Sequence, residues 1–155
     1  LGTLLDRRSR TLWGAAVLAL GFGPVGRALA VRLAALGARV TVAARRPVQR
    51  AMAEELGLRA VPLTELAAEA AAFDTVVNTI PAPVLTAQVL AALPKKSLIV
   101  DLASQPGGTD FAAARRLGHT ALHALSLPTV WAPETAGEAL ARTVQAILQE
   151  REGTV

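Results

Sequence analysis

Short apolar runs alternate along the chain with longer stretches in which alanine and leucine recur at helical spacing. Apolar runs that are rich in valine and bounded by glycine, proline or polar residues are typical of strands buried on both faces. On this basis we predict strands at residues 16–20, 39–43, 75–78 and 98–101, and shorter strands near 59–61 and 119–123.

The stretches between these strands fit helices. We predict helices at residues 24–36, 47–56, 63–70, 82–92, 110–117 and 135–149. Gly37, Gly57 and Gly118 stand where three of these helices should end, and Pro94 follows a fourth. The alternation of strands and helices predicts a doubly wound, mostly parallel sheet of the Rossmann type, with three layers in the order α/β/α.

Composition narrows the class of protein. The chain has 155 residues, no cysteine and 52% hydrophobic residues, with a mean hydropathy of +0.41. This length fits one well-buried core, the lack of cysteine excludes disulfides, and no apolar run is long enough to cross a membrane. The net charge of +4 comes with only 3% aromatic residues and no tyrosine, which disfavours nucleic-acid binding. We therefore expect a cytoplasmic protein that binds neither membranes nor nucleic acids.

One glycine-rich segment has the spacing of a phosphate-binding loop. In "VLALGFGPVGRALAVRLAALGARV", Gly21, Gly23 and Gly26 follow a predicted strand and open a predicted helix. The first glycine permits a tight turn, the second lets the backbone approach a pyrophosphate, and the third lets helix and strand pack closely. The helix N-terminus would present free N–H groups to the phosphates. We predict a dinucleotide site that includes Gly21, Phe22, Gly23, Pro24, Val25 and Gly26.

The end of the second strand indicates which dinucleotide is bound. An acidic residue there would bond the adenosine ribose of NAD, whereas arginine would pair with the 2′-phosphate of NADP. Here Ala44 is followed by Arg45 and Arg46, and no Asp or Glu occurs between the glycine loop and Glu54. We therefore predict these three residues as part of an NADP site, with NAD the less favoured cofactor and Arg45 the phosphate partner. The alternative is a solvated turn ahead of a helix that begins at Pro47.

Ligands of doubly wound sheets bind outside the carboxyl ends of the strands, so the later strand ends are the next candidates. Thr109 or Asp110 can cap the following helix, and we interpret His119 and His123 as structural. No residues have metal-ligand spacing and no hydrolytic triad signature occurs, so we expect no metal and name no catalytic residue. The further residues predicted to contact the cofactor are Asn78, Thr79, Ile80, Pro81, Ala103 and Ser104.

Several motifs in a fixed order resemble one family. The segments are "LGFGPVG", "VAARRP", "NTIPAPVL", "VDLASQPGGTDF" and "LPTVWAPETAGEAL". Many dehydrogenases share the first, but the later ones together are specific. From about residue 5 to 149 the chain resembles the C-terminal nucleotide-binding domain of the family formed by the A subunit of dipicolinate synthase. It is more distantly similar to shikimate dehydrogenase and the D-2-hydroxyacid dehydrogenases.

The resemblance implies an oxidoreductase that forms the aromatic diacid dipicolinate from a dihydro precursor, in the mother cell of a sporulating bacterium. It also implies a small-molecule diacid substrate and, as partner, the B subunit of dipicolinate synthase, and it leaves a homo-oligomer open. Gln105 stands where the family usually has a basic residue, and Ser126 and Thr129 alter the loop around a Leu-Pro pair. The residues expected to line the substrate cleft are Gln105, Gly107, Gly108 and Pro128.

The expected organisation has one main domain. We assign residues 1–14 to a linker or the tail of an N-terminal helix, and residues 15–150 to the dinucleotide-binding domain. We expect a substrate-binding domain to lie outside the chain, so that the chain alone would bind cofactor without turnover. Two other functions remain open: an NADP oxidoreductase domain of the shikimate dehydrogenase type, and a nucleotide-sensing module without catalysis.

Overall fold

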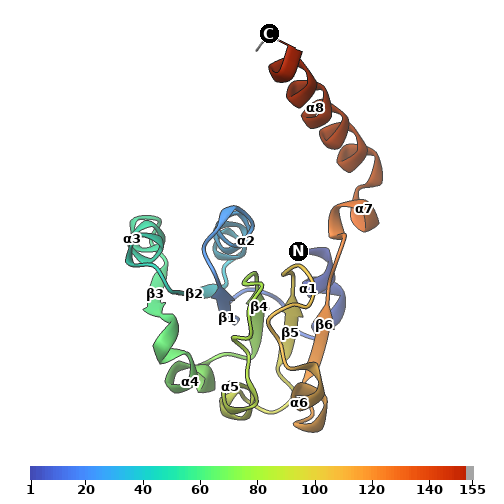
Figure 1. Cartoon of the computed structure of the whole chain (residues 1–155). Helices are drawn as coiled ribbons and strands as arrows, with labels where there is room; N and C mark the ends of the chain where they lie inside the picture. The colour runs from blue at the N-terminus through green and yellow to red at the C-terminus, as the bar shows by residue number, and fades with distance from the viewer. Residues whose placement is uncertain (153–155) are drawn as a thin grey trace. The chain divides into compact units, whose positions relative to one another are not determined.

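A six-stranded parallel sheet is the core of the first of two compact units, Leu1–His123, in the computed structural model (Figure 1). The structure describes residues 1–152. The strand order is β3-β2-β1-β4-β5-β6, so the order reverses between β1 and β4. This confirms the predicted doubly wound sheet, whose ligand crevice opens at that reversal. The strands are β1 Ala16–Leu20, β2 Arg39–Ala44, β3 Arg59–Pro62, β4 Thr75–Asn78, β5 Leu98–Asp101 and β6 Thr120–His123.

Helices cover both faces of the sheet, which confirms the three predicted layers (Figure 1). Two of them, α2 and α3, lie on one face, and α4, α5 and α6 lie on the other. A short helix α1 precedes the sheet, and its Leu4 is buried. Two 3₁₀ turns flank α4, at Leu63–Glu65 and Ala70–Ala72. The helices of this unit are α1 Gly2–Arg7, α2 Pro24–Ala35, α3 Pro47–Glu55, α4 Leu66–Glu69, α5 Ala87–Ala92 and α6 Phe111–Arg116.

Strands β4 and β5, which have a neighbouring strand on either side, are buried along their whole length. Because helices cover both faces, these strands read as continuous apolar runs rather than as alternating ones. Leu18, Val76 and Ile99 are fully buried and belong to one cluster that continues into α5 through Leu90. Each such side chain contributes about 1.5–3 kcal/mol by leaving water. The rigid sheet that results holds the loops at its carboxyl edge.

Most predicted helix ends are confirmed. Gly37, Gly57 and Gly118 all have positive φ after the helices they were expected to end. Asp110 is the cap of α6, because its carboxylate accepts a hydrogen bond of 2.8 Å from Ala113 N. The predicted helix at residues 63–70 is instead broken into a short α4 between two 3₁₀ turns.

The prediction of a helix at residues 82–92 is wrong for its first turn, since α5 begins at Ala87. The amides of Val84 and Leu85 donate to the carbonyl of Gly108, at 3.0 and 2.9 Å, instead of to a preceding turn. Thr86 then caps the helix by accepting from Val89 N at 3.5 Å. Residues 82–86 are therefore loop, fixed by contacts with a distant segment.

The second compact unit, Ala124–Val155, contains two helices within the described residues. Helix α7, Leu127–Trp131, was not predicted from the sequence. The last helix was expected at residues 135–149, whereas α8 extends over Pro133–Glu152 and begins with a proline, as first helical turns favour. Leu140, Val144 and Ile147 of α8 are exposed at helical spacing. Within residues 1–152, no helix is long and apolar enough to span a bilayer.

Candidate functional site

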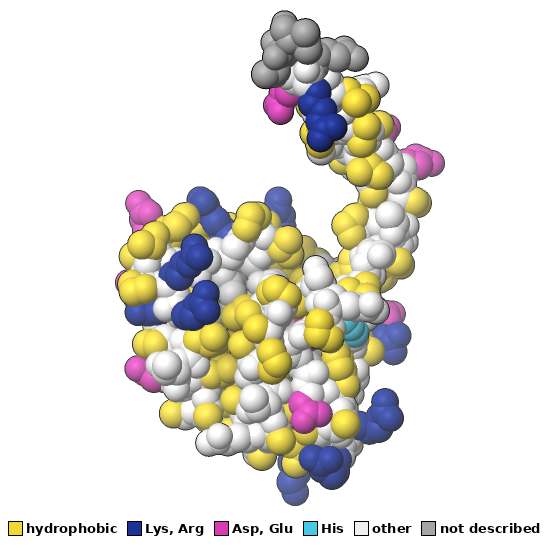
Figure 2. Space-filling view, in the orientation of Figure 1, with side chains coloured by type: hydrophobic (Ala, Val, Ile, Leu, Met, Phe, Trp, Pro, Cys, Tyr) yellow, Lys and Arg dark blue, Asp and Glu magenta, His cyan; other side chains and the backbone are white. Residues whose placement is uncertain are grey.

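A pocket of about 710 Å³ lies where the strand order reverses, at the carboxyl ends of β1, β2 and β4. Its size is within the range of roughly 300–1,000 Å³ that ligand pockets have, and its place is the one where doubly wound sheets bind dinucleotides. Basic side chains gather over α2 and α3 on the face seen in Figure 2. The lining residues are Gly21, Phe22, Gly23, Pro24, Val25, Gly26, Arg45, Arg46, Gln49, Leu63, Thr79, Ile80, Pro81, Ala82 and Val84.

The first and third glycines of the loop are packed too tightly for a side chain. Gly21 has a φ of +89°, and a Cβ there would lie 2.6 Å from Thr79 Oγ1. A Cβ on Gly26 would lie 2.3 Å from the carbonyl oxygen of Gly21. The Gly21 amide also donates to Ala43 O at 2.9 Å, which ties the loop to β2. These contacts hold the start of α2 directly against the ends of the strands.

The second glycine faces open space. Within the described residues, no heavy atom lies within 4 Å of a Cβ built on Gly23, whose φ of −76° is ordinary for any residue. Gly23 is the N-cap of α2 and provides no side-chain cap, and the first turn holds no acidic residue. The first-turn amides therefore remain free for an anion, and the helix dipole favours one there. This open, positive cradle fits the pyrophosphate of a dinucleotide.

The turn from β2 to α3 brings two guanidinium groups to the same pocket. Arg45 and Arg46 are exposed and line it, whereas Ala44 is fully buried at the end of the strand and does not. Arg50 fastens this turn, because its Nη1 donates to Ala44 O at 3.0 Å and to Arg45 O at 3.1 Å. In the part of the chain that the structure describes, no Asp or Glu lines the pocket.

The segment after β4 forms the opposite wall. Thr79 is bound to the end of β1, because both its amide and its hydroxyl donate to Leu20 O, at 2.9 and 2.8 Å. Asn78 is fully buried behind this wall, and its Oδ1 accepts a hydrogen bond of 3.0 Å from Ile80 N. Ile80 and Pro81 consequently face the pocket from a backbone anchored on both sides.

The loop after β5 lies next to this wall. Asp101, at the end of β5, is fully buried and bonds to this loop. Ala103 is buried, whereas Ser104 and Gln105 are exposed. Gly107 and Gly108 are buried at the base of the loop. None of these loop residues is part of the pocket lining.

The structure thus brings most of the predicted cofactor residues into one pocket and leaves others beside it. Pro128 lies apart from them in sequence, in α7 of the second unit. Four lining residues were missed from the sequence: Gln49, Leu63, Ala82 and Val84. Gln49 could have been found, because it lies in the first turn of the helix that directly follows Arg45 and Arg46. The other three reach the pocket only through the packing of the strand ends.

Both histidines are bonded to backbone. His119 Nε2 lies 2.9 Å from Leu90 O, and His123 Nε2 lies 2.8 Å from Ala103 O. The ring of His123 also stacks on Phe111, with the ring centroids 5.5 Å apart. These contacts support the structural role predicted for them. Among residues 1–152, no group of His, Asp and Glu is arranged to hold a metal ion.

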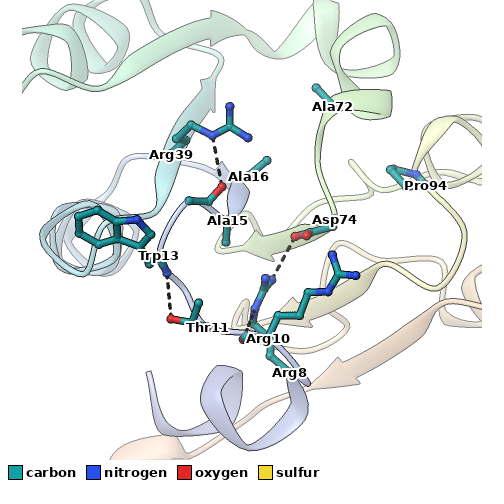
Figure 3. A pocket seen from close by; sticks show the side chains of 11 residues that line it. Arg8, Arg10, Thr11, Trp13, Ala15, Ala16, Arg39, Ala72, Asp74 and Pro94 are labelled. Atoms are coloured by element: carbon teal, nitrogen blue, oxygen red, sulfur yellow. Dashed lines mark hydrogen bonds and ion pairs between the residues drawn. The ribbon is translucent and has the colours of Figure 1, made fainter.

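A second hollow, of about 600 Å³, lies at the amino ends of the strands (Figure 3). Its arginines include Arg8, whose side chain is only 8% exposed and whose Nη1 donates to Asp74 at 3.1 Å and to the Thr75 hydroxyl. Arg8 Nε also donates to Arg10 O at 3.4 Å. This cluster ties the segment after α1 to the start of β4, so it serves the fold at the edge opposite the dinucleotide pocket.

Comparison with known proteins agrees with this geometry. The family model of the D-isomer specific 2-hydroxyacid dehydrogenase, NAD binding domain, matches residues 3–106. The A subunit of dipicolinate synthase from Bacillus subtilis (strain 168) is 43% identical over 140 residues, which are 90% of this chain and 47% of that protein. The chain therefore spans about half the length of the curated relative that it matches.

Two solved structures are similar over nearly the whole chain. The A subunit of dipicolinate synthase from Bacillus halodurans superposes with a TM-score of 0.92 at 41% identity, over 95% of this chain and 50% of that one. The A chain of dipicolinate synthase from Bacillus subtilis gives a TM-score of 0.95 at 39% identity, over 99% of this chain and 52% of that one. This chain belongs to the family of D-isomer specific 2-hydroxyacid dehydrogenase NAD binding domains, an oxidoreductase family that uses a nicotinamide cofactor, and it is similar to the A subunit of dipicolinate synthase.

Proposed function

We propose that this chain is the NADP-binding domain of an oxidoreductase that takes part in forming dipicolinate. Support for the cofactor class comes from the glycine cradle and from the family. Support for the reaction comes from the relatives, whose names identify them as the A subunit of dipicolinate synthase. The proposal places the protein in the cytoplasm of the mother cell of a sporulating bacterium, where its partner is the B subunit of the same enzyme.

The observation that carries the choice of NADP is the pair of arginines in a pocket without a carboxylate. Arg45 and Arg46 stand at the end of β2, where the adenosine ribose of a dinucleotide lies in such sheets. A guanidinium pairs with a 2′-phosphate, while the acid that would repel it is absent from the described lining. Gly23 and the first turn of α2 would hold the pyrophosphate, and Thr79 to Pro81 would lie beside the nicotinamide half.

A bound nicotinamide ring supplies the hydride acceptor, at its C4. The substrate, a dihydro diacid, would lose a hydride from a ring carbon to that acceptor and a proton to solvent, and so become aromatic. Residues of this chain would orient the cofactor and exclude water from one side of it. In the proposal, exposed Gln105 and Ser104 face the substrate from the loop after β5, and residues from the half of the relatives that the chain does not cover complete the site.

A titration tests the cofactor assignment. We expect the chain to bind NADPH more tightly than NADH, and to bind 2′,5′-ADP more tightly than 5′-AMP. Arg45→Ala should lower the affinity for NADPH by about 10- to 100-fold and leave NADH nearly unchanged, because a charge-assisted hydrogen bond is lost. Arg116→Ala, which removes an exposed arginine of α6, is the matched control. Equal affinities for NADPH and NADH, or no effect of Arg45→Ala, would contradict the proposal.

The reaction is tested with a chimera. The chain replaces the corresponding half of the Bacillus subtilis relative, which serves as the positive control, and NADPH formation is followed by fluorescence with a dihydrodipicolinate substrate. We expect turnover with this substrate and none with shikimate. Turnover with shikimate instead would favour the shikimate dehydrogenase type. A chimera that folds and binds NADP⁺ without turning over either substrate would argue for a nucleotide-sensing role.

A further inference from the structure

The carboxylate of Asp101 is fully buried and accepts four hydrogen bonds. Two go to its Oδ1, from Asn78 Nδ2 at 2.9 Å and from Ala103 N at 3.0 Å. The other two go to Oδ2, from Gly108 N at 2.9 Å and from the Thr109 hydroxyl at 2.7 Å. A carboxylate has about four acceptor positions, so its capacity is used in full. One side chain therefore joins β4, β5 and both ends of the loop that follows β5.

Asn78 of β4 is the buried side-chain partner of this carboxylate. Asn78 lies directly opposite Asp101 in the parallel register of β4 and β5, and it is fully buried as well. Its Nδ2 donates to Asp101 and also to Ile80 O at 3.0 Å, while its Oδ1 accepts from Ile80 N at 3.0 Å. Since an unsatisfied buried polar group is costly, the two side chains depend on each other.

The loop held by Asp101 is pressed onto the wall of the dinucleotide pocket. A Cβ on Gly108 would lie 2.5 Å from Ala82 O and 2.6 Å from Ile80 O, so the two segments touch through backbone. The carbonyl of Gly108 also accepts from Val84 N and Leu85 N, at 3.0 and 2.9 Å. Ile80, Ala82 and Val84 line the pocket, whereas Asp101 does not reach it. A shift of the carboxylate would thus move the wall.

Among the described residues, the glycine loop and the basic turn are not hydrogen-bonded to this network, although Gly21 packs against Ile80. Gly21 is bonded to Ala43, and the turn that carries Arg45 is bonded to Arg50. In doubly wound sheets the β1–β3 half takes one nucleotide and the β4–β6 half takes the other. The network of Asp101 therefore belongs to the half of the sheet that would hold the nicotinamide nucleotide, and the adenosine half has supports of its own.

We propose that Asp101 is a positioning residue for the nicotinamide half of the cofactor, acting through Asn78 and Gly108. The inference rests on the proposed binding of a dinucleotide. It follows that weakening the network lowers the affinity for the whole dinucleotide more than the affinity for its adenosine fragment. A residue that merely stabilised the fold would lower both affinities together.

The test compares the dissociation constants of NADPH and 2′,5′-ADP for each variant, at a temperature where circular dichroism shows it folded. Asp101→Asn places an NH₂ group where one carboxylate oxygen now accepts from two hydrogen-bond donors, so those two bonds are lost. We expect NADPH affinity to fall about tenfold or more, with 2′,5′-ADP affinity changing less than about threefold. Thr109→Val, which removes one of the four bonds, should give a smaller effect in the same direction. Asp110→Ala, which removes the α6 cap outside the network, is the matched control and should leave the ratio unchanged.

An exchange of the two side chains sharpens the test. Asn78→Asp alone brings two carboxylates together, while the double variant Asn78→Asp with Asp101→Asn restores one carboxylate and one amide across the strands. We expect the double variant to recover part of the NADPH affinity lost in Asp101→Asn. If Asp101→Asn lost the same factor of affinity for NADPH and for 2′,5′-ADP, the inference would be overturned. If Asp101→Asn does not fold, the same comparison is made with Thr109→Val. Failure of the unaltered chain to bind either ligand would instead overturn the proposed function.

Discussion

The guanidinium of Arg50 donates a hydrogen bond of 3.0 Å to the backbone carbonyl of Ala44, from the first turns of α3 back to the last residue of β2. A second bond, of 3.1 Å, reaches the carbonyl of Arg45. The short turn that carries two exposed arginines is therefore fixed from within the fold. A turn fixed before a ligand arrives loses less entropy on binding, which raises affinity.

Replacing Arg50 tests this support. Arg50→Met keeps most of the aliphatic stem and removes both hydrogen bonds, so we expect NADPH affinity to fall by about 3- to 10-fold through a loosened turn. Arg50→Lys retains the charge, but its side chain is one atom shorter than the path to the Nη1 that donates to both carbonyls. We expect its NADPH affinity to lie between those of Arg50→Met and the unaltered chain. Titration by NADPH fluorescence measures both. Unchanged NADPH affinity in Arg50→Met would show that the support of the turn does not matter for binding.

Gly23 is expected to matter for binding and not for stability. Its ordinary φ and the open space around it let Gly23→Ala fold normally, yet the new methyl group would stand in the cradle at the N-terminus of α2. We expect dinucleotide affinity to fall by about tenfold or more while the melting temperature stays within a few degrees. Gly137→Ala, inside α8 and equally free of close neighbours, should leave binding unchanged and stabilise its helix by about 0.5–1 kcal/mol. Unchanged affinity in Gly23→Ala would argue against a pyrophosphate at this place.

Arg8 should contribute to stability although Asp74, its ion-pair partner, is half exposed. The Arg8 side chain is 8% exposed and also donates to the buried Thr75 and to Arg10 O. Loss of these bonds in Arg8→Ala should lower the free energy of unfolding by about 1–3 kcal/mol, measured by urea denaturation. Arg7→Ala removes an ion pair with Asp6 in which both side chains are more than half exposed, and should cost less than about 1 kcal/mol. Equal losses in the two variants would mean that burial of Arg8 is irrelevant.

The pair of Arg59 and Glu69 should make a small, pH-dependent contribution to stability. Two hydrogen bonds from Arg59, of 2.7 and 2.8 Å, lower the pKa of Glu69. Desolvation of the carboxyl group raises this pKa, and the positive charge of Arg59 lowers it further. A lowered pKa in the folded state means that the contribution is present above the usual glutamate value of about 4.3 and is lost as the pH falls through the lowered value.

Urea denaturation between neutral pH and pH values below the lowered pKa of Glu69 measures this contribution. We expect the chain to be slightly more stable than Glu69→Gln at neutral pH, and the difference to vanish on acidification and to shrink in high salt. Glu65→Gln is the control, because Glu65 acts on Arg59 through charge alone. A difference that persists unchanged in acid would show that the Glu69 carboxylate is not responsible.

The sequence by itself determined the layered architecture, because the features that specify it are local. The predicted strands at 16–20, 75–78 and 98–101 have the bounds that the structure gives them. Gly37, Gly57 and Gly118 ended their helices since a residue of positive φ is favoured there whatever surrounds it. The glycine spacing and the two arginines likewise sit on one short strand–loop–helix–strand stretch, which is why the candidate pocket could be anticipated.

Only the tertiary structure decided which distant residues meet. Asn78 and Asp101 are 23 positions apart, and their pairing follows from the register of β4 against β5, which no local pattern specifies. Pro83, before α5, would suit the first turn of a helix, yet the amides of Val84 and Leu85 bond to Gly108, because buried backbone groups need hydrogen-bond partners. Leu63, which follows β3, and Val84 likewise reach the pocket only through the packing of the strand ends. Propensity and capping act within a few residues along the chain, whereas the shape of the site depends on how the whole sheet packs.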